Sequence, residues 1–96
     1  GLTFDKHGYM YVADTGNCRV QRFLPPSLHG TTVAGFAGLY TNTLNGLNQP
    51  TAVAVDVNLN LYIADNNNQR VIRYSPNATS GTVLFTLSSG KPYGIA

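Results

Sequence analysis

The sequence predicts an all-β fold built from a repeated four-stranded antiparallel unit. Three observations lead to this prediction: the sequence matches itself at a fixed offset, its apolar residues fall in short runs about ten residues apart, and clusters of Gly, Pro, Asn, Asp and Ser separate those runs. Short runs bounded by such turn residues are typical of strands rather than helices.

The repeat is visible when the sequence is aligned with itself at an offset of 51 positions. Over 31 positions, without a gap, 11 residues are identical to their partners, whereas chance would give about two at ordinary composition. A third copy begins at residues 92–96, which match residues 50–54 at an offset of 42. The identical residues of the first copy are Asp5, Tyr11, Ala13, Asp14, Asn17, Arg19, Val20, Arg22, Pro25, Gly30 and Thr31.

The second copy shows the expected elements in order. Strands are predicted at residues 52–55, 61–64, 70–74 and 82–87, separated by polar turns at 56–60 and 65–69 and by a loop rich in breaker residues at 75–81. The strands lack a clean alternation of polar and apolar residues, which fits a sheet that is covered on both faces. Four short strands in about 42 residues are typical of one blade of a β-propeller.

We therefore expect a β-propeller fragment of about two four-stranded blades. Its parts are a first repeat at residues 1–34, an inter-blade insertion at 35–49, a second repeat at 50–90 and the start of a third at 91–96. Because the chain begins and stops within expected strands, we expect it to be a piece of a longer array. Its outer edges would then be bare, and about three repeats are needed for a stable stack.

The repeated residues resemble the NHL repeat. That pattern runs Pro-x-Gly-apolar-Ala-apolar-Asp, then Tyr-apolar-Ala-Asp, then Asn-x-Arg-apolar-x-x-aromatic, and the second copy matches it over residues 50–56, 61–65 and 68–74. Ala52 replaces the usual Gly, and Leu59 replaces the turn Gly that the first copy has as Gly8. The resemblance implies a propeller, most often six-bladed and TolB-like, but it does not imply one activity.

The composition narrows the classes of partner. Charged residues make up only 10% of the 96 residues and the net charge is +2, without the clustered Lys and Arg of a nucleic-acid interface, so nucleic acid is not the expected partner. No apolar run is long enough to span a membrane. The low charge and the glycosylation sequon at Asn77 weakly favour a secreted or extracellular chain. Cys18 is the single cysteine, so it is either free or paired outside this chain.

Two acidic and two basic residues recur at equal spacing and are interpreted as structural. Asp14 and Asp65 each end a strand, and Arg19 and Arg70 follow five residues later. A catalytic group is needed once, whereas this pair recurs in each repeat. We therefore expect the Asp to bond its loop and the Arg to pack and pair locally.

The candidate contacts with a partner lie in loops. Phe36 and Tyr40 belong to the insertion, and Asn66 and Asn67 belong to the polar turn of the second repeat. In a propeller, the connection between blades lies at the same end as the loop joining the second and third strands of a blade. Aromatic residues are enriched at interfaces, so this end is the expected binding surface, although its apolar residues also suit packing on the next blade.

No residue pattern indicates catalysis, a metal or a cofactor. His7 and His29 lack partners at a metal-binding spacing, and no nucleophile motif or phosphate cradle is present. The predicted function is therefore a non-catalytic binding or scaffold propeller for a protein, peptide or glycan. Two alternatives from the resemblance stay open: part of an amidating-lyase-like enzyme, and an RNA-binding domain like those of tripartite-motif proteins.

Overall fold

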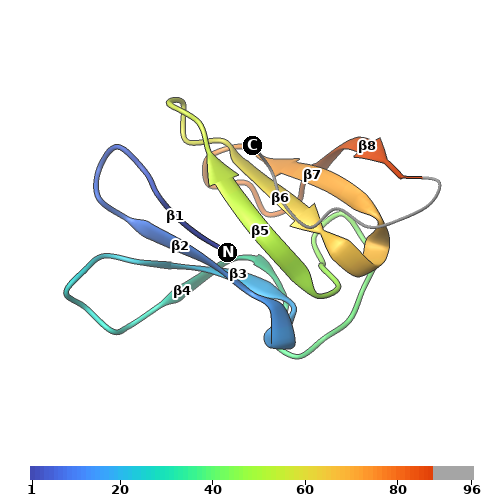
Figure 1. Ribbon diagram of the computed structural model, residues 1–96, viewed down its shortest axis with the longest axis horizontal. Helices are drawn as coiled ribbons and strands as arrows, with labels where there is room; N and C mark the ends of the chain where they lie inside the picture. The colour runs from blue at the N-terminus through green and yellow to red at the C-terminus, as the bar shows by residue number, and fades with distance from the viewer. Residues whose placement is uncertain (88–96) are drawn as a thin grey trace.

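The computed structural model describes residues 1–87, which form two four-stranded antiparallel sheets (Figure 1). The first sheet, blade 1, contains in order β1 (Leu2–Phe4), β2 (Met10–Asp14), β3 (Arg19–Phe23) and β4 (Thr31–Gly35). Blade 2 contains β5 (Pro50–Val55), β6 (Leu61–Asp65), β7 (Arg70–Tyr74) and β8 (Thr82–Thr86). The helical elements described are two 3-10 turns, η1 (Thr15–Asn17) and η2 (Asn66–Asn68).

The predicted all-β class and the two four-stranded sheets are confirmed. The strand ends differ by one to two residues from the expected ones: β5 begins at Pro50 instead of residue 52, and β6 ends at Asp65 instead of residue 64. The start of the third repeat, at residues 91–96, and the last residues assigned to the second, at 88–90, lie outside the described part of the chain.

The two blades share one hydrophobic core. β5 packs against β1 and β2, and Figure 1 shows these inner strands side by side while β4 and β8 lie on the outer sides. Val20 from blade 1 and Ile63 and Ile72 from blade 2 are fully buried in this core. Leu47, which lies between the blades in the sequence, is fully buried as well. The connection at 36–49 therefore contributes to the core instead of only bridging two sheets.

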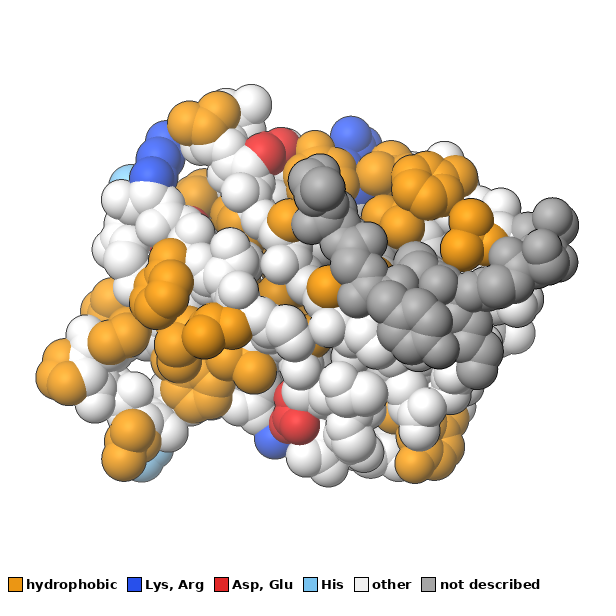
Figure 2. Space-filling view, viewed as in Figure 1, with side chains coloured by type: hydrophobic (Ala, Val, Ile, Leu, Met, Phe, Trp, Pro, Cys, Tyr) orange, Lys and Arg blue, Asp and Glu red, His pale blue; other side chains and the backbone are white. Residues whose placement is uncertain are grey.

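Buried and partly exposed residues alternate along β2 of blade 1, whereas β6 and β7 of blade 2 are buried almost continuously. In β2, Tyr11 and Ala13 are buried, whereas Met10, Val12 and Asp14 are only partly covered. Leu2 and Phe4, which pair with Val12 and Met10, are more than half exposed, and Figure 2 shows hydrophobic side chains gathered over this half of the molecule. In β6 and β7, by contrast, four residues of five are buried. The expectation of a sheet covered on both faces therefore fits blade 2 better than blade 1.

The turns between the first two strands of each blade are built alike. The Oδ1 atom of Asp5 accepts hydrogen bonds from the backbone N–H groups of His7 and Tyr9, at 2.8 and 3.1 Å. Asp56 accepts the corresponding bonds from the residues at 58 and 60, both at 2.9 Å. The polar turn that the sequence predicts at residues 56–60 is present, and side-chain-to-backbone bonds close it.

Successive antiparallel strands place their loops at alternating ends of a blade. The β2–β3 and β6–β7 loops, which contain η1 and η2, therefore lie at one end, where the chain also leaves β4 and enters β5. We call this the loop end, and it comprises residues 15–18, 36–49 and 66–69. In the described residues, the structure has no helix of the length and apolar character needed to cross a membrane.

Candidate binding surface

The insertion at residues 36–49 is fastened to blade 2 by one arginine. The guanidinium of Arg70 donates to the carbonyl oxygens of Asn42, Thr43 and Gly46, at 3.1, 2.7 and 3.0 Å. Its Nε atom donates to Oδ2 of Asp65 at 2.8 Å. The side chain of Asp65 is fully buried and that of Arg70 is 8% exposed. The pair that the sequence predicts to be local therefore also binds a segment more than 20 residues away.

Three further groups of blade 2 bind the insertion. Asp65 uses its other oxygen to accept the backbone N–H of Asn48 at 2.8 Å, and Asn68 donates through Nδ2 to the carbonyl of Thr41 at 2.8 Å. The Tyr74 hydroxyl donates to the carbonyl of Leu44 at 3.0 Å. Burial raises the pKa of Tyr74 to about 12, so this hydroxyl keeps its proton at any physiological pH. The backbone of the insertion is thus fixed at several points along its length.

The equivalent pair in blade 1 has a more open setting. The Nε atom of Arg19 donates to Oδ2 of Asp14 at 3.0 Å, and the two side chains are 25% and 31% exposed. Asn17 donates to the same carboxylate oxygen at 3.1 Å, as Asn68 does to Asp65 at 2.8 Å in blade 2. The two blades therefore repeat one Asp–Asn–Arg arrangement, which is buried only where the insertion covers it.

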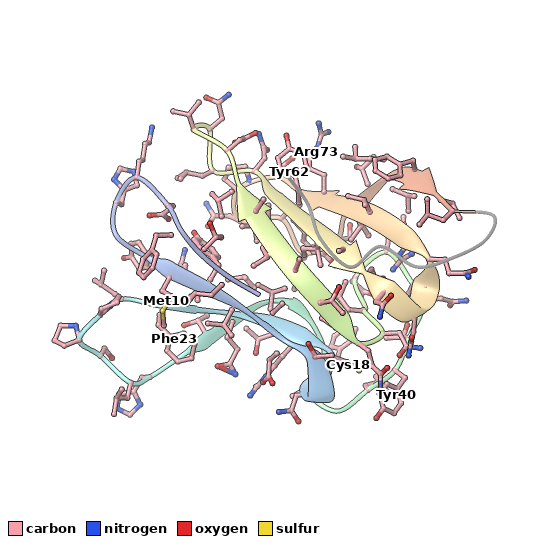
Figure 3. All side chains as sticks on the ribbon, in the orientation of Figure 1. Met10, Cys18, Phe23, Tyr40, Tyr62 and Arg73 are labelled. Atoms are coloured by element: carbon pink, nitrogen blue, oxygen red, sulfur yellow. The ribbon has the colours of Figure 1, made fainter. Side chains whose placement is uncertain are left out.

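The insertion exposes large apolar side chains although its backbone is fixed. Phe36, Leu39, Tyr40 and Leu44 are 42%, 55%, 60% and 51% exposed. Figure 3 shows Tyr40 at the same end of the molecule as Cys18, which closes the η1 turn. Both predicted aromatic contact residues are therefore accessible at the loop end.

The two predicted asparagines are less accessible. Asn66 is only 8% exposed, and its Oδ1 atom is buried without a hydrogen-bond partner. Asn67 is half-buried, and its side-chain amide donates to the side-chain oxygens of Asn48 and Gln49 at 3.4 and 2.5 Å. Asn66 therefore offers little surface to a partner, and Asn67 helps to join the η2 turn to the end of the insertion.

Sequence reasoning missed a second arrangement that recurs in both blades. The Tyr11 hydroxyl donates to Oδ2 of Asp5 at 2.9 Å, and the Tyr62 hydroxyl donates to Oδ2 of Asp56 at 2.9 Å. Burial would raise the pKa of Asp5, but the bonds from Tyr11 and from two backbone N–H groups outweigh it and lower that pKa. The sequence did contain a signal for this Asp–Tyr bond, because the Asp and the Tyr are both identical between the two copies.

The cysteine, the two histidines and the sequon asparagine discussed above lie apart from one another. Cys18 is free and fully buried, and its Sγ atom accepts the backbone N–H of Gln49 at 3.4 Å. His7 and His29 are exposed in the β1–β2 and β3–β4 loops. Asn77 is exposed with a φ of 61° in a turn closed by the Ala78 N–H to Ser75 carbonyl bond of 3.0 Å. Within residues 1–87, no group of three or more His, Cys, Asp or Glu side chains forms a candidate metal site.

Comparison with known proteins identifies the repeat. The family model of the NHL repeat matches residues 47–74, a segment that runs from the buried Leu47 through β5, β6 and β7 to the end of Tyr74. No curated protein sequence matches the chain. The matched segment contains Asp65 and Arg70. Blade 1 is the first copy of the same repeat and has Asp14 and Arg19 at the equivalent positions. Residues 47–74 are therefore similar to an NHL repeat, and the described residues form two four-stranded β-sheets.

Proposed function

We propose that this chain is a non-catalytic interaction module that binds a protein or peptide at its loop end. The observation that carries the proposal is the contrast within the insertion. Its backbone is fixed to buried groups of blade 2, while Leu39 and Tyr40 are more than half exposed. A large apolar side chain on a fixed backbone loses little further conformational freedom when a partner covers it, which favours affinity.

Tyr40 is the proposed anchor of this surface, with Phe36 and Leu39 beside it in the sequence. Tyrosine is enriched among the residues that dominate binding energies. The NHL repeat supports a propeller, which we take to have six such blades, as the rigid support for this surface. A glycan is the second class of partner that an exposed tyrosine with neighbouring amide groups suits.

The test selects peptides that bind the immobilised protein and compares their affinity for four forms of it: the wild type, Tyr40→Ala, Phe36→Ala and Leu28→Ala. Tyr40→Ala should weaken the selected peptides by about 1–3 kcal/mol without lowering the melting temperature. Leu28→Ala is the matched control, because Leu28 is 91% exposed in the β3–β4 loop at the opposite end. That variant should bind like the wild type.

Three outcomes would overturn the proposal. The first is that Tyr40→Ala and Phe36→Ala lower stability while affinity is unchanged, so that the loop is structural only. The second is that Leu28→Ala weakens binding as strongly as Tyr40→Ala. The third is that a glycan array gives saturable binding that depends on Tyr40 while the peptide selection gives none.

A further inference from the structure

A cavity of about 540 Å³ lies between the outer strand of blade 1 and the β7–β8 loop of blade 2. Its walls include every residue of β4 and every residue from 74 to 79. Leu59 and Leu61 from blade 2, and Tyr11 and Arg22 from blade 1, complete much of the lining. Its volume is within the range of about 300–1,000 Å³ that is usual for ligand sites.

The lining shows that the cavity meets the edge of β4. Tyr11, Arg22 and Thr31 are register neighbours across β2, β3 and β4, so part of the cavity lies over one face of the sheet. Successive residues of a strand point to opposite faces, so a cavity that touches all five residues of β4 also reaches the edge of that strand. β4 is the last strand of its sheet, and among the described residues no further strand bonds its outer side. Such an edge presents unpaired N–H and C=O groups, which are a template for an added strand.

The lining of the cavity carries one positive charge and no negative charge. Arg22 is the single charged residue among those that line the cavity, and the two ion pairs found among the described residues involve other arginines. Its guanidinium stands 4.7 Å from the centre of the Tyr9 ring. The nearby carboxylate of Asp5 is already bonded by Tyr11 and by two backbone N–H groups. The cavity therefore suits a ligand that carries a carboxylate.

Part of the lining is apolar near the middle of β4. Val33 and Ala34 of β4 face the cavity together with Leu59 and Tyr74 from the opposite blade. An added strand places alternate side chains in pockets of this kind, while its backbone supplies most of the hydrogen bonds. An extended peptide fits these three features together, whereas a compact anion would leave the edge of β4 unpaired.

We propose that blade 1 binds an extended peptide along β4 as a fifth strand, with a carboxylate of the peptide at Arg22 and an apolar side chain against Val33 and Leu59. Phe36 and Asn45 of the loop end also line this cavity, whereas Tyr40 does not. The variants that test the two sites differ, so either proposal can fail without the other.

The probe is the pentapeptide Val-Thr-Glu-Thr-Val, in which Glu and both Val residues point to the same face of an extended strand. It carries a fluorescent acyl group on its N-terminus and an amidated C-terminus, and it is titrated against the protein by fluorescence anisotropy. Saturable binding below about 1 mM is expected. Replacing the peptide's Glu by Gln should weaken binding about tenfold, because the carboxylate partner of the arginine is lost. N-methylation of the two Thr residues removes N–H donors from one edge of the peptide, and N-methylation of the other residues removes those of the opposite edge. One of the two N-methylated peptides should lose binding, while the other should retain it.

A further peptide identifies the source of the carboxylate. Val-Thr-Gln-Thr-Val with a free C-terminus carries its carboxylate at the end of the chain. If it binds as tightly as the Glu peptide, the site takes a C-terminal carboxylate. If it binds as weakly as its amidated form, the site takes an acidic side chain, and both results support the proposal.

The protein variants complete the test. Arg22→Gln should weaken the Glu peptide about tenfold and abolish its advantage over the Gln peptide, while Arg22→Lys should keep part of that advantage. Lys6→Gln removes the same charge from an exposed turn and should bind like the wild type. The proposal is overturned if binding is absent at about 1 mM, if neither N-methylated peptide loses affinity, or if Arg22→Gln retains the preference for Glu.

Discussion

Arg70 and Arg19 occupy the same position in the two blades, but their surroundings make them unequal. Arg70 is buried with a fully buried Asp65 and donates to three carbonyl groups of the insertion. Arg19 pairs with Asp14 at similar distance, yet both side chains are about a quarter exposed or more. Solvent screens exposed pairs, so they contribute little, whereas removing one partner of a buried pair leaves an uncompensated charge.

We therefore predict a large difference between two matched variants. Arg70→Gln should lower the free energy of unfolding by about 3–5 kcal/mol, because the buried Asp65 loses its cationic partner and three carbonyl groups lose the guanidinium donor. Arg19→Gln should lower it by about 1 kcal/mol or less. Chemical denaturation followed by circular dichroism measures both.

Arg70→Lys provides a check if the glutamine variant does not fold. Arg70→Lys keeps the charge beside Asp65 but cannot donate to all four acceptors at once. Its loss of unfolding free energy should therefore fall between those of Arg70→Gln and Arg19→Gln. Equal costs for the Arg70 and Arg19 variants would show that the insertion does not depend on Arg70.

At the scale of an element, the β1–β2 and β5–β6 turns share one geometry with different residues. Gly8 has a φ of 88° and Leu59, at the same position of the repeat, has a φ of 68°. This left-handed region costs residues with a Cβ atom about 1–2 kcal/mol. Blade 2 therefore accepts backbone strain that blade 1 avoids, and Leu59 contributes apolar surface to the inter-blade cavity.

Two glycines with open surroundings isolate this backbone effect. A Cβ atom added at Gly8 or at Gly16 would meet no atom within 4 Å, and only Gly8 has a left-handed φ. Gly8→Ala should lower the free energy of unfolding by about 1 kcal/mol. Gly16→Ala should leave it unchanged or raise it by up to about 1 kcal/mol, because alanine restricts the unfolded chain. Equal melting temperatures of the two variants would contradict the argument.

The sequence predicted the elements better than the contacts between them. Turn residues and short apolar runs are local signals, so all four strands of blade 2 were located to within one or two residues. The role of the insertion was not predictable in the same way, because Arg70 binds backbone carbonyls and every residue carries one. The burial of Asn66 depends likewise on tertiary packing. The Asp–Tyr bonds, by contrast, had a signal in the identical residues at positions 5 and 11 of the first copy.

At the scale of the whole molecule, the two blades and the insertion form one packed unit. Val20 of blade 1, Leu47 of the insertion and Ile72 of blade 2 belong to the same buried cluster. Tyr74 belongs to it too, and its hydroxyl donates to the carbonyl of Leu44. A change in the charge of this one phenol therefore acts on the junction of all three parts.

This position leads to a prediction about alkaline pH. Burial raises the pKa of Tyr74 to about 12 from an ordinary value of 10.0. Between these values the folded protein holds a proton that the unfolded chain releases. The associated stability is present in full below pH 10 and is lost as the pH rises toward 12, with a slope of at most about 1.4 kcal/mol per pH unit for this one group.

Tyr74→Phe separates this effect from other alkaline transitions. The variant lacks the hydrogen bond to Leu44, so it should be about 1 kcal/mol less stable than the wild type at neutral pH. Because it has no phenol to ionise at this position, its free energy of unfolding should fall less steeply between pH 10 and 12, and the two profiles should converge. Denaturation midpoints measured across that range provide the comparison. Parallel profiles would show that Tyr74 ionises alike in the folded and unfolded chain, and would contradict its place as a buried donor at the junction of the blades.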